Sequence, residues 1–443
     1  MERSMDDPSL QMPLPANERF DAVVLGAGIS GLVAASILSS KGERTLIVDD
    51  YDHVGGNHMD WMSTEGYTFD VGSLIFQDDS PLLRHFPELL PLYVPIAPTW
   101  GRLNPQGRIT AYPISVRDDI IAAGPFAMAW MGVSVLYARL FGQKMNNARD
   151  FARYWVGAYF LRRSGLETYM SRFYGIAPEK IDLDLARKRM GWISEHASIG
   201  NIMKKLTRSK AAGTPTNRQL ARPREGFSRL YDTAIQRLKG AGVSFRLSAA
   251  AQNIVKTDEG FELRLENGVV STGRIISTIP IPQLERLCGF PSKSALDTIT
   301  LITLYFSFAG HRGFAQSIIY NFSLDGAWKR LTVYSDFYGR VNDREYFAVE
   351  VVAGQVSTVA QAEIDFRNHA FSNNLFTGEL TLAGSQILES AYPIYRQGAA
   401  QRAAEAVKSF RAFGIESMGR QGGFNYQPTA RVSTVEVEAA LGG

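Results

Sequence analysis

The feature that most constrains the fold of this chain is a glycine turn near its start, Gly26-Ala27-Gly28-Ile29-Ser30-Gly31. Residues 19–25 end in a short apolar run rich in valine before the turn, and the run that follows the turn has helical spacing as far as Gly42. A second strand is expected over Thr45–Val48, and Asp49 closes it. Strand, turn, helix, strand and acid make one βαβ unit of about 30 residues. The sequence therefore predicts an α/β fold of the Rossmann-like kind.

The spacing of the glycines also predicts what the turn binds. Gly26 permits the tight turn, Gly28 lets the backbone approach a pyrophosphate, and Gly31 lets helix and strand pack closely. The start of the helix then offers free N–H groups and the positive end of its dipole to phosphates. Asp49, about 20 residues further on, is expected to accept hydrogen bonds from a ribose hydroxyl. The turn therefore predicts a dinucleotide site, whose expected contacts also include Ile29, Ser30 and Asp50.

The pattern of a nucleotide-binding domain returns later in the sequence. A helix is expected over 227–242, strands over 243–247, near 254, over 261–265 and over 274–278, and a further helix over 399–411, before a last glycine-rich turn at 415–426. The domain is therefore discontinuous, with an α+β substrate domain inserted in it. The first inserted piece looks helical, and the second carries strand-like runs at 301–308 and 346–352. We predict 19–76, 216–289 and 391–443 for the nucleotide-binding domain, and 77–215 and 290–390 for the substrate domain.

Length and charge narrow the class of protein. A single compact core rarely exceeds ~250–300 residues, so 443 residues fit two domains. The net charge of +3 is mild; it suits an anionic substrate and does not point to nucleic acid as a partner. Cys288 is the one cysteine, which excludes an internal disulfide framework and a cysteine-cluster metal site. No other metal-ligand cluster stands out, and a reducing cytoplasm fits this cysteine usage.

Three further segments are distinctive. Residues 1–18 carry acids and prolines but no apolar run, so we interpret them as a flexible tail rather than a signal peptide. Residues 207–223 are polar, basic and broken by proline and glycine, which predicts a mobile loop. Residues 120–138 hold no charge over 19 residues, close to the about 20 that span a bilayer. We interpret this run as an apolar helix of the substrate domain, either buried or at the surface. A peripheral membrane contact is the alternative, and a transmembrane helix is the least favoured interpretation.

A second glycine pair, Gly55-Gly56-Asn57, follows Asp49 by six residues. An acid, five residues and a glycine pair resemble the motif of a large flavoprotein group that includes monoamine oxidases, protoporphyrinogen oxidases, phytoene desaturases and UDP-galactopyranose mutases. The physical sense is again close approach of the backbone, along the pyrophosphate towards the flavin. The resemblance implies that the cofactor is FAD. We expect it to be noncovalent, because Cys288 is poorly placed for a covalent link.

Other segments resemble the same group in the same order, namely PREGFSRLYDTAIQRL, RIISTIPIP and GRQGGFNYQPTARV. The resemblance implies that Ala251 contacts the adenine by its backbone and that Gly72 and Ser73 lie near the flavin ring, which His58 also approaches. It implies that the closing segment packs a helix start against the flavin and that Arg420 reaches a phosphate or the flavin edge. The contacts expected from that segment are Gly419, Arg420, Phe424, Asn425 and Tyr426.

The resemblance leaves two kinds of chemistry open. In an oxidase the flavin accepts a hydride and the protein mainly orients the substrate. In a mutase, reduced flavin attacks a sugar carbon without net redox, and arginines hold the diphosphate of the substrate. Arg330 and Tyr392 match mutase segments and favour the second kind. The two positions where mutases carry histidines under the flavin are Leu74 and Gln77 here, which speaks against it.

We therefore expect an FAD-dependent oxidoreductase of this group, acting on a bulky small-molecule substrate that is lipid- or glycan-linked. A mutase-like enzyme working on a sugar nucleotide is the alternative. His58, Arg330 and Tyr392 are the candidate catalytic residues. The apolar run 120–138 favours a lipid, whereas Arg330 and Tyr392 favour a diphosphate sugar. The sequence carries no signal for an oligomeric state.

Overall fold

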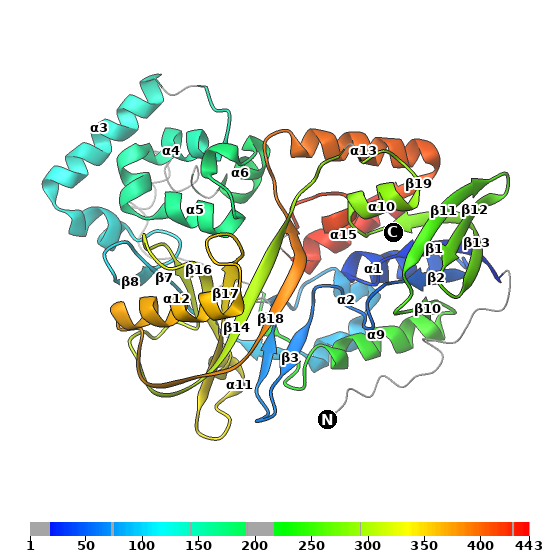
Figure 1. Cartoon of the computed structure of the whole chain (residues 1–443), viewed down its shortest axis with the longest axis horizontal. Helices are drawn as coiled ribbons and strands as arrows, with labels where there is room; N and C mark the ends of the chain where they lie inside the picture. The colour runs from blue at the N-terminus through cyan, green and yellow to red at the C-terminus, as the bar shows by residue number, and fades with distance from the viewer. Residues whose placement is uncertain are drawn as a thin grey trace.

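The computed structural model describes residues 18–71, 75–141, 144–191, 193, 217–292, 294–427 and 429–442. Over these residues the strands form two seven-stranded sheets and two smaller ones. In Figure 1 the first large sheet lies on the right, the second at the lower left, and a group of helices at the upper left. Of the predicted tail, 1–18, only Glu18 lies within the described residues, where it begins a strand.

The first sheet carries the glycine turn at the carboxyl end of its strand β1. Its order is β10-β2-β1-β13-β12-β11, and β19 pairs with β13 in addition. The pairs from β10 through β13 to β19 are parallel, whereas β11 and β12 form an antiparallel meander with β13. The strands are β1 Glu18–Leu25, β2 Thr45–Val48, β10 Ser244–Arg246, β11 Ala251–Thr257, β12 Gly260–Leu265, β13 Gly268–Ser277 and β19 Ile415–Ser417. Every strand predicted for this domain is therefore present.

Helices cover both faces of the first sheet, because its parallel strands are apolar on both faces. Ala22 and Val24 of β1 face one core with α1, α9 and α15, whereas Val23 and Leu25 face the other with α10 and α13. The bounds are α1 Ile29–Ser40, α9 Ser228–Gly240, α10 Ile281–Leu287, α13 Ala399–Phe413, α14 Gly419–Gly422 and α15 Ala430–Leu441. The predicted helices at 227–242 and 399–411 are thereby confirmed as α9 and α13.

The second sheet is built around two long antiparallel strands, β14 and β18. Its order is β18-β14-β17-β16-β15-β7-β8, and α12 packs on one face through Ala362, Phe366 and Ala370. Its elements are β7 Trp100–Leu103, β8 Ile109–Ala111, β14 Thr298–Arg312, β15 Ile318–Asn321, β16 Trp328–Val333, α11 Ser335–Tyr338, β17 Glu345–Val352, α12 Val359–Ser372 and β18 Phe376–Pro393. The strand-like runs at 301–308 and 346–352 are confirmed as parts of β14 and β17. β18 continues past the domain boundary predicted at 391.

A layer of helices packs against the second sheet at β15 and β7. Their core includes Ile318 and Tyr320 of β15, with Phe160 and Met170 from the helices. The helices are α3 Pro125–Phe141, α4 Ala148–Arg163, α5 Leu166–Tyr174 and α6 Leu183–Arg189. The described part of the first inserted piece is therefore mainly helical from Pro125 on, as its sequence predicts, whereas strands β6 (Val94–Ile96), β7 and β8 precede these helices.

The small sheets correct one sequence expectation. Residues 207–216 of the predicted mobile loop lie outside the described residues, but Gln219–Ala221 form strand β9. β9 pairs with β5 and β6 on its two sides, which satisfies its backbone and excludes a loop there. The remaining elements are β3 Asp60–Met62, β4 Thr68–Asp70, β5 Phe76–Gln77, α2 Leu82–His85 and β6 Val94–Ile96.

Candidate functional site

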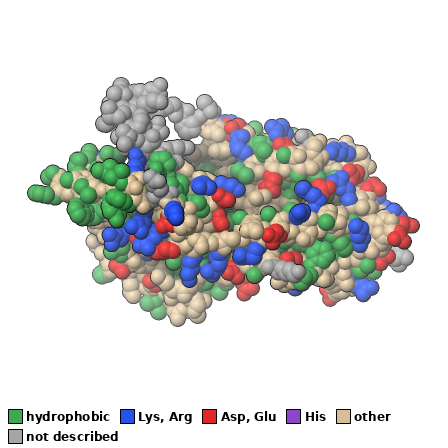
Figure 2. Space-filling model, turned by 90° about the horizontal axis from the view of Figure 1, so that it is seen from above, with side chains coloured by type: hydrophobic (Ala, Val, Ile, Leu, Met, Phe, Trp, Pro, Cys, Tyr) green, Lys and Arg blue, Asp and Glu red, His purple; other side chains and the backbone are tan. Residues whose placement is uncertain are grey.

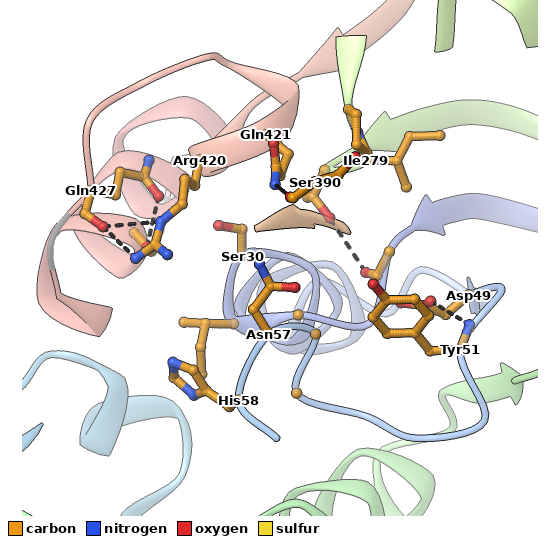
Figure 3. A pocket seen from close by; sticks show the side chains of 18 of the residues that line it. Ser30, Asp49, Tyr51, Asn57, His58, Ile279, Ser390, Arg420, Gln421 and Gln427 are labelled. Atoms are coloured by element: carbon orange, nitrogen blue, oxygen red, sulfur yellow. Dashed lines mark hydrogen bonds between the residues drawn. The ribbon is translucent and has the colours of Figure 1, made fainter. Parts of the chain in front are cut away.

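A cleft of about 370 Å³ lies over the glycine turn, at the carboxyl ends of β1 and β2. Figure 3 shows its walls: Ser30, Asp49 and Asn57 from the first βαβ unit face Ile279, Ser390 and Arg420 from segments far away in the sequence. Ligands in open α/β sheets bind outside the carboxyl ends of the strands. The cleft therefore lies where a dinucleotide is expected.

The glycines of the turn are required by what lies next to them. Gly26 has a φ of +100°, in the region that favours glycine, and a β-carbon on it would collide with the Thr278 hydroxyl. A β-carbon on Gly31 would collide with the carbonyl oxygen of Gly26, so this glycine brings helix and strand together. A β-carbon on Gly56 would lie 3.3 Å from the Gly28 α-carbon. The floor of the cleft is therefore bare backbone from both glycine motifs.

Asp49 holds the turn as well as facing the cleft. Its carboxylate accepts hydrogen bonds from the Ala27 N–H at 2.5 Å and the Tyr51 N–H at 2.9 Å. Burial raises the pKa of Asp49 to about 6, although these two N–H groups oppose the shift and Asp50 adds to it. Each carboxylate oxygen can accept more than one hydrogen bond. Asp49 can therefore accept a ribose hydroxyl while it keeps the turn in place.

The opposite wall comes from the C-terminal segment. Arg420 donates from Nε and Nη2 to the carbonyl oxygen of Gln427, at 3.1 and 2.5 Å. The Gln427 side chain in turn donates to Glu436 and accepts from Ser433 at 2.7 Å. This network fixes the Arg420 guanidinium at the edge of the cleft, where a cation suits phosphate oxygens.

A second cavity of about 300 Å³ joins the cleft at its inner end. Asn57, His58 and Arg420, together with Gln427 and Thr429, line both spaces. Beyond them the second cavity is lined mostly by aromatic and aliphatic side chains of the second sheet and the helical layer. They include Trp100, Phe173, Tyr320 and Tyr392, and the segments after β18 and α14 add Tyr395 and Tyr426. A molecule in the second cavity therefore meets the end of the cleft at His58 and Arg420.

His58 stands at the junction as a neutral side chain. Its Nδ1 is hydrogen-bonded to the Tyr231 hydroxyl, and its ring stacks on Phe227 with centroids 5.6 Å apart. Burial, with a further contribution from the Arg420 guanidinium, lowers the pKa of His58 to about 3. At neutral pH the imidazole therefore carries no charge, so it can shape the junction or share a hydrogen bond but cannot act as a cation.

Three charged groups form a cluster at the wall of the second cavity, which we call the Lys329–Glu350–Arg330 cluster; Lys329 and Arg330 line the cavity. The Lys329 ammonium lies 2.9 Å from one carboxylate oxygen of Glu350, and Arg330 donates to the other oxygen from Nε at 2.8 Å and from Nη2. An irregularity of β16 between Trp328 and Arg330 lets both neighbours reach the same carboxylate. Burial raises the pKa of Glu350, but Arg330 and Lys329 outweigh it and hold this pKa below its usual range. The cluster therefore carries a net charge of about +1.

Tyr392 completes this end of the cavity. The Lys329 ammonium lies 4.7 Å from the centroid of the Tyr392 ring, a cation–π contact, and 5.1 Å from the centroid of the Phe173 ring. The cluster therefore sits beneath aromatic faces, and its net positive charge is directed at whatever occupies the cavity. The arrangement suits a substrate that has an anionic group and a bulky apolar part.

The structure brings the predicted residues together in two places. Of the predicted cofactor contacts, those that line the cleft are Gly26, Gly28, Ile29, Ser30, Asp49, Asp50, Gly55, Gly56, Asn57 and Arg420. The three predicted catalytic residues, His58, Arg330 and Tyr392, all line the second cavity. Gly31 and Gly419 do not line the cleft. Gly419 packs behind Ser30, since a β-carbon on Gly419 would meet the Ser30 side chain at 2.7 Å. Gly72 and Ser73 lie outside the described residues.

Four predicted contacts lie elsewhere in the structure. Phe424 and Asn425 line a separate cavity between α6, α13 and α15, because the chain turns at Phe424, whose φ is +51°. Tyr426 reaches the second cavity rather than the cleft. Ala251 begins β11 and does not line the cleft. Ser248 and Ala249 lie closer, since their N–H groups donate to the carbonyl oxygens of Tyr51 and Asp49.

Several residues of the cleft and of the second cavity were not predicted from the sequence. Thr278 and Ile279 lie within the RIISTIPIP segment, which the sequence did single out, directly after the last residue of β13, so their position at the carboxyl end of this strand was a usable signal. Lys329 stands next to Arg330 and was hidden because strand neighbours normally point to opposite faces. Glu350 and Ser390 carry no motif. Only the pairing of β16 with β17 brings Glu350 to the cluster.

The neutral His58 predicts a pH dependence of stability. Its pKa of about 3 in the folded state lies below the ordinary 6.5, so the unfolded chain binds more protons between these values and unfolding is favoured as pH falls from 6.5. We expect His58→Gln to lose less free energy of unfolding than the wild type between pH 7 and pH 4, by about 3 kcal/mol. Urea unfolding at a series of pH values measures this difference. His311→Gln, at an exposed histidine of β14, is the control and should follow the wild type; equal slopes for all three proteins would contradict the burial argument.

Sequence comparison identifies relatives of this chain. The NAD(P)-binding Rossmann-like domain family matches residues 24–88. The chain is 27% identical over 311 residues to the chloroplastic protoporphyrinogen oxidase of Nicotiana tabacum, in an alignment that covers 65% of this chain and 55% of that protein. The chain thus spans about half the length of this curated relative.

Structural comparison extends the likeness to nearly the whole chain. A reduced UDP-galactopyranose mutase superposes with a TM-score of 0.77 at 17% identity, covering 96% of both chains. A variant of putrescine oxidase superposes with a TM-score of 0.62 at 12% identity, covering 96% of this chain and 98% of the other. At these identities the likeness shows the fold. It confirms the predicted class, an α/β protein with a Rossmann-like domain and an inserted second domain.

Proposed function

We propose that this chain is an FAD-dependent oxidoreductase of the amine-oxidase-like superfamily, to whose members it is similar, and that its substrate lies in the second cavity. FAD supplies a hydride acceptor when it is bound. The observation that carries the proposal is the shared wall: Asn57, His58 and Arg420 line both the cleft and the second cavity. A cofactor in the cleft and a substrate in the second cavity therefore meet at these residues.

The residues of the cleft fit FAD. Gly28 and Gly56 face each other with bare α-carbons, which leaves a cradle that a β-carbon would narrow. Helix α1 starts at this cradle, so its first N–H groups suit a pyrophosphate. Asp49 suits the ribose of the adenosine part, and Arg420 suits a phosphate or the flavin edge. The group would thus be held mainly by backbone and by two charged side chains.

The chain's own residues have separate tasks in the second cavity. The Asn57 side chain donates to the Ala391 carbonyl oxygen at 3.0 Å, which ties the second glycine motif to β18 and fixes the junction. The aromatic lining excludes water and offers flat surfaces to an apolar substrate. The Lys329–Glu350–Arg330 cluster positions an anionic group of the substrate at a set distance from the junction. Neutral His58 adds no second cation beside Arg420 at that junction.

These features support a substrate that is bulky, partly apolar and anionic. A lipid-linked or glycan-linked molecule has this chemistry, and we propose that class. The mild positive charge of the chain agrees with it. Aromatic rings flanking a cation, as at Lys329, suit the boundary between the apolar and the anionic part of such a substrate.

A mutase that works on a sugar nucleotide is the second candidate. Arg330 favours it, because a guanidinium fork pairs with phosphate oxygens on two atoms at once. Arg330 already donates two hydrogen bonds to Glu350, which leaves it fewer donors for a diphosphate. This pairing is why we rank the oxidoreductase first.

The test is an absorbance spectrum of the purified protein, followed by anaerobic additions. Oxidised-flavin bands are expected, and an anionic lipid- or glycan-linked substrate should bleach them without dithionite. Turnover only after dithionite, with the flavin still reduced at the end, would place the protein with the mutases. The absence of flavin bands, together with failure to take up added FAD, would overturn both candidates.

Arg330→Lys separates the candidates by a second route. The variant keeps the charge beside Glu350 but removes the fork. If the fork holds a diphosphate, the KM for the sugar nucleotide should rise roughly tenfold or more, because a hydrogen bond to a charged group is worth about 1.5–3 kcal/mol. If the cluster only supplies a net positive charge, KM for an anionic substrate should change little.

A further inference from the structure

Helix α3 carries a row of large apolar side chains that point away from the protein. Phe126, Trp130, Val133, Tyr137, Leu140 and Phe141 are each more than half exposed, and Phe126 is 91% exposed. We call this row the apolar ridge. Figure 2 shows hydrophobic side chains gathered at the end of the molecule that α3 forms. Soluble proteins rarely expose a continuous apolar patch of this kind without using it.

The spacing of the ridge follows the helix. Each member follows another member by three or four residues along α3, so they share one face. The other face packs on α4: Met131 is buried, and the Ser134 hydroxyl accepts a hydrogen bond from the Tyr159 N–H at 3.1 Å. A β-carbon on Gly157 would meet this hydroxyl at 2.9 Å, so the two helices are in close contact. Packing therefore holds the helix with its ridge outward.

The segment before α3 is anchored inside the protein. Asp119 forms a buried ion pair with Arg102, and Arg102 also donates to the Ser164 carbonyl oxygen at 2.7 Å. Among the described helices none is by itself long and apolar enough to cross a membrane; Val116–Ala123 and Pro125–Phe141 pass such a test only as a pair, with a bend of 108° between them. Because one half of that pair is anchored by Asp119, the geometry favours a helix lying on a surface over one crossing a bilayer.

The charges around the ridge have one predominant sign. Residues 116–163 hold seven lysines and arginines against three aspartates, and Arg139 is the one charged residue among the 17 of α3. Four of these cations are exposed, namely Arg117, Lys144, Arg153 and Arg162. Asp119, in contrast, is buried in its ion pair with Arg102. Cationic side chains beside an inserted apolar helix suit the phosphates of anionic lipids.

We propose that α3 docks this protein on the surface of an anionic lipid bilayer. The apolar ridge enters the boundary between headgroups and acyl chains, and Trp130 and Tyr137 lie at the level where aromatic residues are favoured. The exposed arginines and Lys144 contact lipid phosphates. The proposal does not depend on the proposed reaction, because it concerns a surface outside both the cleft and the second cavity.

Flotation of the flavin-loaded protein with vesicles tests the docking. One set of vesicles is phosphatidylcholine, and the other contains phosphatidylglycerol in addition. We expect the wild type to float with the anionic vesicles and to detach as salt is raised. Phe126→Ser with Trp130→Ser should lower the partition constant at least about tenfold, since burial of even one large apolar side chain is worth that much.

A matched variant separates the ridge from apolar surface in general. Ile364 and Phe371 are exposed on α12, 61% and 82% respectively, so Ile364→Ser with Phe371→Ser removes two comparable side chains elsewhere. This control should bind vesicles as the wild type does, and both variants should unfold at the wild-type temperature.

Three outcomes would overturn the proposal. The wild type could fail to bind either kind of vesicle, or bind both equally, or keep its binding after the ridge is changed. A second copy of this chain is the other molecule that could cover the apolar ridge, and sedimentation equilibrium measures whether the protein forms such a dimer. The wild type could form a dimer and bind no vesicles, while the variant with Phe126→Ser and Trp130→Ser is a monomer. The ridge would then be an interface between two copies of the chain.

Discussion

Gly28→Ala is expected to give a folded protein that has lost most of its affinity for FAD. Gly28 has a φ of −74° and a ψ of −179°, which any residue adopts, and a β-carbon there would come no nearer than 3.9 Å to its closest neighbour, the Gly56 α-carbon. The fold therefore tolerates the methyl group. The cleft does not, because the bare backbone at Gly28 is where a pyrophosphate must approach.

We expect FAD to bind this variant roughly ten- to hundredfold more weakly, which corresponds to an overpacking cost of about 1–3 kcal/mol. Flavin content after purification and titration of the apoprotein with FAD measure the loss, and thermal unfolding of the apoprotein checks the fold. Gly240→Ala is the matched control, since Gly240 ends α9 and a β-carbon there meets nothing within 4 Å. If Gly28→Ala takes up FAD as the control does, the cofactor does not lie on this turn.

Among the variants considered, Glu350→Gln is expected to lower the free energy of unfolding the most. Glu350 and Lys329 are each 2% exposed, and the Arg330 side chain is 16% exposed. Removal of the carboxylate leaves two buried cations side by side without the one anion that both contact. Breaking a buried ion pair by removing one partner costs about 3–5 kcal/mol, and we expect a loss of this size in denaturant unfolding.

The pH dependence of this loss has a definite sign. Because the pKa of Glu350 is lowered by folding, its contribution is present above the ordinary glutamate pKa and is lost as pH falls through the folded-state value. The difference between wild type and Glu350→Gln should therefore be full at pH 7 and shrink in acid. A constant difference across pH would contradict the assignment of the charge to Glu350.

Two further variants control for the charge argument. Lys329→Met combined with Glu350→Gln restores the wild-type net charge of the cluster, so it should recover part of the stability that Glu350→Gln loses. Glu379→Gln removes a carboxylate that pairs with Arg344 at the surface, where its side chain is 70% exposed. This variant should change stability little, because exposed pairs contribute little. Equal losses for Glu350→Gln and Glu379→Gln would contradict a buried cluster.

Local signals in the sequence determined the nucleotide-binding half of this protein. The turn from Gly26 to Gly31, the acid at 49 and the pair at Gly55 lie within about 30 residues of each other. Gly31 is required by the carbonyl oxygen of Gly26, which the βαβ unit itself places. Strands and helices of this domain were predictable for the same reason, since buried parallel strands read as continuous apolar runs. Contacts between residues that are close in the sequence produce patterns that can be recognised in a short segment.

The substrate end was decided by the tertiary structure. The Lys329–Glu350–Arg330 cluster depends on the register of β16 against β17 and on an irregularity that turns two neighbours to one carboxylate. The junction at His58 needs Tyr231 from α9 and Arg420 from the C-terminal segment, each far from it in the sequence. The outward direction of the α3 ridge depends on its packing against α4. These features arise from contacts between distant segments, whose register and orientation a single sequence does not encode in any local pattern.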